Sequence, residues 1–293
     1  MPVYAFAAHF ADVICCSSFL SAKKAEELIS HIKQMTNMKR FDDLSQDIDV
    51  VLRNKTLNDE CTKNIESIHD AIRNGKKICF SYAKYDTNGE LWYVKRTENG
   101  YEKVSADTNE YIPLGDALPR IYMVSPYKMV WDNSQCYLIC GRKNDEGRVR
   151  IANFRADKIF NLSVTDEKND DLDPTNAFYD VNTNSLDAEK YLSPIFEMFG
   201  SKDDEVTKVK FAVLKKLKGA MTDKFGKQTH FIEYDESHFC FSVQIQRSNT
   251  LFGWLAKYRY DELRILEPNE LIMEFADHLK SVLTEYGTDD LRE

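Results

Sequence analysis

The sequence predicts an α+β protein with a helical N-terminal region, a strand-rich middle region and a mixed C-terminal region. Apolar residues recur at helical spacing up to Gly75, and from there to Leu162 they alternate with a period of two between turn signals. Strand and helix patterns mix again from residue 204 onwards. The 293 residues are enough for two modest domains, and 43% apolar with 30% charged residues is ordinary for a globular chain.

Residues 1–74 are predicted to form a helical connector. Ser21 is of a type favoured at helix N-caps, and an apolar stripe with helical spacing follows it. That stripe contains Ala25, Leu28, Ile29, Ile32 and Met35. A second stripe ends at Gly75, which is typical of a helix C-terminus, and contains Cys61, Ile65, Ile68 and Ile72. A further helix is expected around residues 41–52.

Residues 75–165 are predicted to form several short strands of a small barrel or sandwich. The Asn-Gly pairs at 88–89 and 99–100 are hairpin signals, and "DNSQ" and "KNDEG" mark two further turns. Residues 166–203 are acidic and rich in turn residues, which predicts a linker. Residues 204–293 form the second mixed unit, whose last helix is expected to begin near Pro268.

Composition and motifs argue against several classes of function. The net charge of -9 means that any contact with nucleic acid must come from a local basic patch. The sequence contains none of the common nucleophile, metalloprotease or phosphate-loop motifs, so we expect no enzyme activity and no cofactor. The seven cysteines lack zinc-binding spacing, so we expect no metal and a reducing, cytoplasmic setting. No apolar run is long enough to span a membrane.

The stretch "YMVSPYKMVWDNSQCYLICGR", residues 122–142, is rich in aromatic residues and precedes an arginine-rich strand. Alternation places Ser125 and Tyr127 on one face of its first strand, and Pro126 suggests an edge or a bulge. Six basic residues against three acidic ones lie between positions 142 and 158. Guanidinium, phenol and hydroxyl groups together suit an anionic, planar ligand. The alternative, favoured on these residues alone, is that the aromatic residues form core and the arginines a solvated rim.

The same residues resemble the signature of WYL domains. "VSPYKMVWDNSQCYLICGR" followed by "NFRADKI" matches that signature at Pro126, Tyr137, Leu138, Phe154, Arg155, Asp157 and Ile159. The family's tryptophan is Cys136 here, and Lys158 stands where many members have arginine. "YLSPIFEMFG", "MTDKFGKQ" and residues 248–271 are similar to the C-terminal extension called WCX. "FADVICCSSFLSAKKAEELI" is similar to the connector that follows a winged helix-turn-helix domain, which this chain has no room for.

The resemblance implies a fold and a function. The expected fold is an Sm-like small β-barrel at residues 75–165 and an α/β-sandwich-like WCX unit at residues 204–293. The expected function is the ligand-sensing region of a bacterial transcriptional regulator, which binds a nucleotide or single-stranded nucleic acid and acts on operator DNA through a domain absent from this chain. The resemblance also implies a homodimer. The expected ligand-binding residues are Ser125, Tyr127, Tyr137, Arg148, Arg150 and Arg155.

One alternative function is kept open. The chain could be a stand-alone protein that binds single-stranded nucleic acid and modulates a phage-defence effector. Tyrosines near arginines suit this activity equally well, because bases stack on rings while guanidinium groups contact phosphates.

Overall fold

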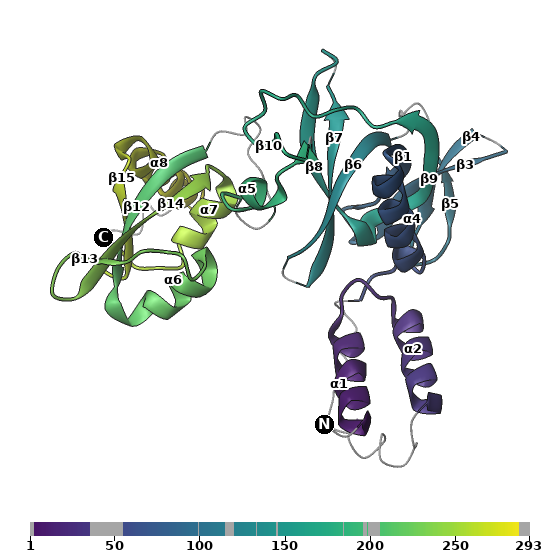
Figure 1. The fold of residues 1–293 in the computed structure, drawn as a ribbon, viewed down its shortest axis with the longest axis horizontal. Helices are drawn as coiled ribbons and strands as arrows, with labels where there is room; N and C mark the ends of the chain where they lie inside the picture. Colours follow the sequence, from purple (N-terminus) through teal and green to yellow (C-terminus); the bar gives the residue numbers. More distant parts are fainter. Residues whose placement is uncertain are drawn as a thin grey trace. The chain divides into compact units, whose positions relative to one another are not determined.

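The computed structural model describes residues 3–35, 55–98, 100–114, 120–132, 134–144, 146–183, 185–195, 198 and 206–286. Within these ranges the chain is α+β, with seven α-helices and four antiparallel sheets, which confirms the predicted class. The chain divides into two compact units, Met1–Leu186 and Asp187–Glu293 (Figure 1). The division falls inside the predicted linker, and residues 169–186 belong to the first unit, where Phe178 and Leu186 are buried.

The N-terminal helices pair through a small apolar cluster. Helix α1 spans Val3–Cys16 and helix α2 spans Ala22–Met35. Ser21 caps α2 as predicted, because its Oγ accepts a hydrogen bond from the Lys24 amide at 3.2 Å. Ile14, Leu20 and Ala25 form the buried contact between the two helices. The helix expected around residues 41–52 lies outside the described residues.

Helix α4 covers the main sheet of the first unit. It spans Cys61–Asn74 and ends, as predicted, at Gly75, whose φ of 60° is the left-handed conformation that glycine adopts without steric cost. It packs against strands β1, β6 and β9 (Figure 1), and Ile68 and Ala71 enter the core. The amphipathic stripe read from the sequence therefore marks the face of α4 that contacts the sheet.

The main sheet has five antiparallel strands in the order β8-β7-β6-β1-β9. Their bounds are Lys76–Tyr82 for β1, Ile121–Asp132 for β6, Gln135–Lys143 for β7, Val149–Arg155 for β8 and Ile159–Lys168 for β9. The edge strands β8 and β9 are joined by the short 3-10 turn η2, Ala156–Lys158, but no ladder between them closes the sheet into a barrel in the described part of the chain. The register of β6 shifts between Pro126 and Lys128, so the proline lies at the predicted bulge.

Four strands inserted between β1 and β6 form a separate sheet in the order β2-β3-β4-β5. They are Lys84–Tyr85, Leu91–Thr97, Gly100–Ser105 and Tyr111–Pro113. The predicted turn at Gly89, with φ of 83°, joins the first two. This sheet is fixed to the main one by Val94, whose amide donates to Ser81 Oγ at 2.8 Å and whose carbonyl accepts from Asn161 Nδ2 at 2.9 Å. The short strands Tyr179–Asp180 and Ser185–Leu186, β10 and β11, complete the unit.

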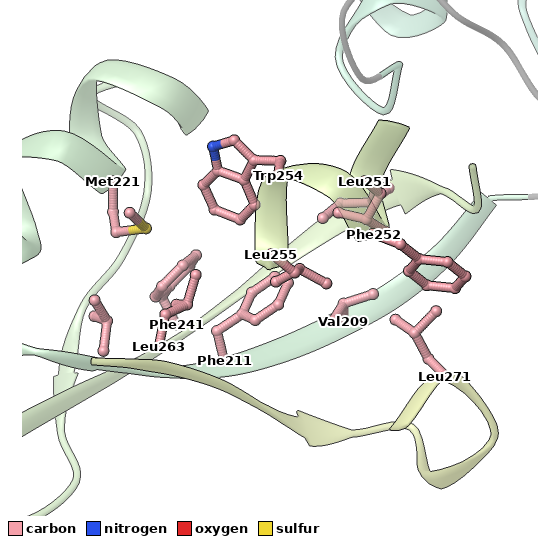
Figure 2. Close-up of a cluster of buried hydrophobic side chains, with 12 residues drawn as sticks. Val209, Phe211, Met221, Phe241, Leu251, Phe252, Trp254, Leu255, Leu263 and Leu271 are labelled. Atoms are coloured by element: carbon pink, nitrogen blue, oxygen red, sulfur yellow. The ribbon is translucent and has the colours of Figure 1, made fainter. Parts of the chain in front are cut away.

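The second unit is a four-stranded antiparallel sheet with helices. The sheet order is β13-β14-β12-β15, with bounds Ile232–Glu233, His238–Gln246, Val206–Leu214 and Leu263–Glu267. The helices are Ala188–Leu192, Lys218–Phe225, Asn249–Leu255 and Asn269–Glu285, labelled α5 to α8, with the 3-10 turn η3 at Lys215–Leu217. Phe211 and Phe241 of the sheet pack with Trp254 of α7, as Figure 2 shows. Helix α8 begins directly after Pro268, as predicted.

Candidate functional site

Ser125 and Tyr127 bind the segment that follows strand β9. Ser125 is fully buried, and its Oγ accepts a hydrogen bond from the Asp170 amide at 2.8 Å. Tyr127 Oη donates to the Asp170 carbonyl at 3.1 Å. The structure therefore brings these two predicted site residues together, but around a neighbouring stretch of backbone, where their polar atoms already have partners.

The Asp170 carboxylate completes this network. Its oxygens lie 3.2 Å from Lys77 Nζ and 2.7 Å from Lys143 Nζ. Burial opposes ionisation of Asp170, but the hydrogen bonds from Lys143 and Lys77 outweigh it and hold the pKa of the carboxyl below its ordinary value. Lys77 Nζ also lies 3.2 Å from Glu167 Oε2, so the two lysines face two carboxylates. We call this network, which joins β1, β6 and β7 to residue 170, the latch.

Arg148 and Arg150 lie near the turn between β7 and β8. Arg148 is exposed and faces Glu146 at 3.7 Å. Arg150 is exposed on β8 and is paired in register with Arg142 of β7. Neither lines the two pockets described next, so the arginine-rich strand does not gather its three arginines at one place.

Arg155 and Tyr137 are paired in register at the opposite end of the same ladder. The Arg155 guanidinium donates two hydrogen bonds to the Asp157 carboxylate, at 3.0 Å from Nε and 2.7 Å from Nη2. Asp157 is only 8% exposed, and the Arg155 amide donates to Tyr82 Oη at 3.2 Å. Arg155 is thus held in place, with Nη1 outside the ion pair.

Arg155 lines a mostly polar cleft of about 460 Å³. The cleft is built from the end of α1, the segment before α4, the start of β7 and the turn η2. Its charged lining consists of the cations Lys55, Arg155 and Lys158 and the carboxylate of Asp157. Because Asp157 can balance only one of these cations, the cleft has a surplus of positive charge in a chain whose net charge is -9.

The two lysines of the cleft are partly removed from water. Lys55 Nζ donates to the carbonyls of Ile14 at 2.8 Å and Ser17 at 2.9 Å, at the C-terminus of α1. Burial lowers the pKa of Lys55, and burial together with the positive charge of Arg155 lowers the pKa of Lys158. A bound anion would restore the favourable environment that these ammonium groups lack, so the cleft is suited to an anionic ligand.

Gln135 adds a hydrogen-bond acceptor to this cleft. Its side-chain Oε1 is buried and has no hydrogen-bond partner among the described residues. Buried acceptors are normally satisfied, so an unsatisfied one in a cleft suits a hydroxyl or amine donor of a ligand.

A second pocket, of about 500 Å³, lies beside the cleft and is more apolar. Four aromatic side chains line it: Tyr82, Tyr85, Trp92 and Tyr93. Tyr85 lines both pockets, and Lys158 Nζ lies 5.0 Å from the centroid of its ring. The sequence reasoning missed this pocket, although the aromatic and basic residues interleaved in "YAKYDTNGELWYVK" are the signal that could have revealed it.

Comparisons with known proteins show only a distant likeness of fold. No family model and no curated protein matches the chain. One similar solved structure is proteasome accessory factor B/C (PafBC) of Arthrobacter aurescens, with a TM-score of 0.30 and 15% identity, covering 97% of this chain and 36% of that one. Another is a CRISPR Cas-related protein, with a TM-score of 0.39 and 14% identity, covering 89% of this chain and 62% of that one. The chain thus spans less than two thirds of either structure.

Neither a membrane-spanning helix nor a metal-binding cluster is present in the described ranges. They contain no helix that is long and apolar enough to cross a membrane. They also contain no group of three or more histidine, cysteine, aspartate or glutamate side chains placed to hold a metal ion.

Proposed function

We propose that this chain is the ligand-sensing region of a WYL-type transcriptional regulator and that it binds a negatively charged ligand, a nucleotide or single-stranded nucleic acid, in the cleft at Arg155. The observation that carries the proposal is the charge of that cleft, where three partly desolvated cations face one carboxylate. Cations in such surroundings favour phosphate, which guanidinium and ammonium groups bind by charge-assisted hydrogen bonds.

The strand order of the main sheet supports the proposal of a WYL-type domain. Helix α4 precedes five antiparallel strands, and the first of these, β1, is flanked by the second, β6, and by the last, β9. This arrangement is compatible with the Sm-like fold that the resemblance implies, with the sheet open between β8 and β9 in the described residues. Of the six predicted site residues, Arg155 is the one that lines the cleft.

The cleft connects the helical connector to the main sheet. Ser18, just after α1, donates from its Oγ to the carbonyl of Ser134, just before β7. Phe19 packs edge-on against Trp131 of β6, with ring centroids 4.6 Å apart. A ligand bound between the connector and the sheet would stabilise one arrangement of the two, and this population shift is the proposed route to a DNA-binding domain outside the chain. A homodimer that reads two operator half-sites belongs to the same proposal.

Titration of fluorescently labelled short single strands and of mononucleotides tests the proposal. We expect Arg155→Ala to weaken binding by roughly 10- to 100-fold, because it removes a charge-assisted contact. Arg148→Ala is the matched control, since it deletes an exposed arginine outside the cleft, and its affinity should match wild type. Binding should also weaken steeply with added salt, because phosphate contacts release counterions.

Arg155→Ala leaves the buried Asp157 without its ion-pair partner, so a loss of binding could come from a folding defect. A second variant separates the two causes. Lys158→Gln removes a cleft cation that has no ion pair in the described residues and should also reduce affinity. Unchanged binding in both variants, or an equal loss in Arg148→Ala, would contradict the assignment of the cleft. If ligand binds but the full-length protein's affinity for operator DNA does not change, the stand-alone binding protein is the better description.

A further inference from the structure

We infer that the aromatic pocket is a second subsite, which takes the nucleobase of a ligand whose phosphate occupies the Arg155 cleft. The inference rests on the proposed function and narrows it, because it makes the ligand a base-bearing nucleotide and not a bare phosphate or sugar phosphate. The pocket is lined mainly by residues of the inserted strands β2 to β5. Figure 1 shows β3, β4 and β5 of this inserted sheet beside β9 of the main sheet.

The rings of the pocket are held in place by contacts with neighbouring side chains. The Trp92 indole N–H donates to Asp86 Oδ2 at 3.2 Å. The Tyr93 ring stacks on Phe160 of β9, with centroids 4.2 Å apart and planes 12° from parallel. Aromatic side chains that are already ordered lose little conformational freedom when a base stacks on them, so such a pocket binds a planar ring efficiently.

The aromatic side chains of the pocket are more exposed than core residues. The core of the inserted sheet is small: Leu91 and Val104 are buried in it, whereas Trp92 and Tyr93 are only half-buried and Tyr85 is 58% exposed. Single exposed aromatic residues are common on protein surfaces, but several around one 500 Å³ hollow are typical of a binding pocket.

Positive charge accompanies the rings. Lys84, Lys103 and Arg120 are exposed at the pocket, and the carboxylate there, that of Asp86, already accepts from Trp92 and from nearby backbone amides. Aromatic faces combined with cations form the usual arrangement for bases that carry a phosphate backbone. An anionic aromatic ligand gains more from these three cations than an uncharged one does, because its charge is opposite to theirs.

Two residues join the pocket to the cleft. Tyr85 lines both, with Lys158 of the cleft 5.0 Å from its ring centroid. Tyr82 lines the aromatic pocket, and its hydroxyl accepts the amide hydrogen bond of Arg155 at 3.2 Å. A nucleotide that spans Tyr85 therefore presents its base to one hollow and its phosphate to the other.

Trp92 variants test the inference with two probes, adenosine monophosphate and inorganic phosphate. Base stacking contributes about 1–3 kcal/mol, so Trp92→Leu should weaken nucleotide binding by roughly 5- to 100-fold and leave phosphate binding unchanged. Trp92→Phe keeps an aromatic ring and should retain most of the affinity. In wild type the nucleotide should quench the fluorescence of Trp92, and the Trp92→Phe substitution should abolish this quenching.

Tyr111→Leu is the matched control, because Tyr111 is an exposed aromatic residue of the same sheet, 47% accessible, and does not line the pocket. Its nucleotide affinity should equal that of wild type. The inference is overturned if wild type binds phosphate as tightly as the nucleotide, or if Trp92→Leu binds both probes like wild type. Failure of the proposed function gives a different result, in which wild type binds neither probe or Arg155→Ala binds both normally.

Discussion

A methyl group added at Gly141 should destabilise the network of hydrogen bonds and ion pairs around Asp170. Gly141 lies on β7, paired in register with Ser125. A Cβ atom added there would collide with Tyr127 Oη and would lie 2.7 Å from both Tyr127 Cζ and Val149 Cγ1. Carbon atoms normally approach no closer than about 3.5 Å, so one of these side chains has to move.

The cost of Gly141→Ala can be derived from these contacts. Overpacking typically destabilises a protein by about 1–3 kcal/mol, and replacing glycine in a strand returns about 0.5–1 kcal/mol of backbone entropy. Tyr127 cannot swing away freely, because its hydroxyl is bound to the Asp170 carbonyl. We therefore expect a net loss of about 2 kcal/mol, a change of roughly 30-fold in the opening equilibrium of the first unit.

Hydrogen exchange of peptides from β6 and β7 measures this loss locally, which matters because a chain with two units need not unfold in one step. Gly219→Ala is the control, since nothing lies within 4 Å of that position in α6, and it should be neutral or slightly stabilising. In a Tyr127→Ala background the added methyl group should cost less, because only its contact with Val149 remains, giving a coupling energy of about 1–2 kcal/mol. A Gly141→Ala protein as stable as wild type, or two substitutions whose costs simply add, would refute the packing argument.

Two further predictions concern the latch and Asn58, which binds the backbone at the turn η2. Because the folded pKa of Asp170 is depressed, its contribution is complete above the ordinary aspartate pKa of about 3.9 and is lost as the pH falls through the folded value. The free energy of unfolding, measured with urea, should therefore differ most between wild type and Asp170→Asn near neutral pH. This difference should disappear below about pH 4, and a difference that is constant with pH contradicts the prediction. Asn58→Ala should destabilise the first unit by about 1–3 kcal/mol, because Asn58 Nδ2 donates to the carbonyls of Asp157 at 3.2 Å and Ile159 at 2.7 Å. Asn58→Asp cannot donate and should be equally harmful, whereas a mild effect of either substitution on the unfolding midpoint would show that these bonds contribute little.

Local sequence signals predicted the elements of the fold well. The cap at Ser21, the helix end at Gly75, the hairpin turn at Gly89 and the start of α8 after Pro268 all lie where turn and capping chemistry places them. Such features depend on a few consecutive residues, so they can be read without knowledge of distant contacts. Periodicity likewise identified the buried face of α4.

The candidate site was only partly predictable. Strand alternation placed Ser125 and Tyr127 on a face correctly, but it could not show that Asp170, more than forty residues later, would take up their polar atoms. The expected ligand-binding set also put Arg148 and Arg150 together with Arg155, although alternation alone assigns Arg155 to the other face of the strand. Along the ladder Arg150 and Arg155 lie towards opposite ends.

By itself, the sequence determined the α+β class and several element boundaries, because propensity, capping and alternation are local properties of the chain. Arg155 was singled out by its match to the WYL signature and not by these local properties. Only the tertiary structure decided which charges and rings share a cleft. Lys55 and Lys158 come together with Arg155 because a helix end, a loop and the turn η2 converge there, and Trp92 joins them through an inserted sheet. Such proximity depends on how distant segments pack, and no pattern within a single segment encodes it.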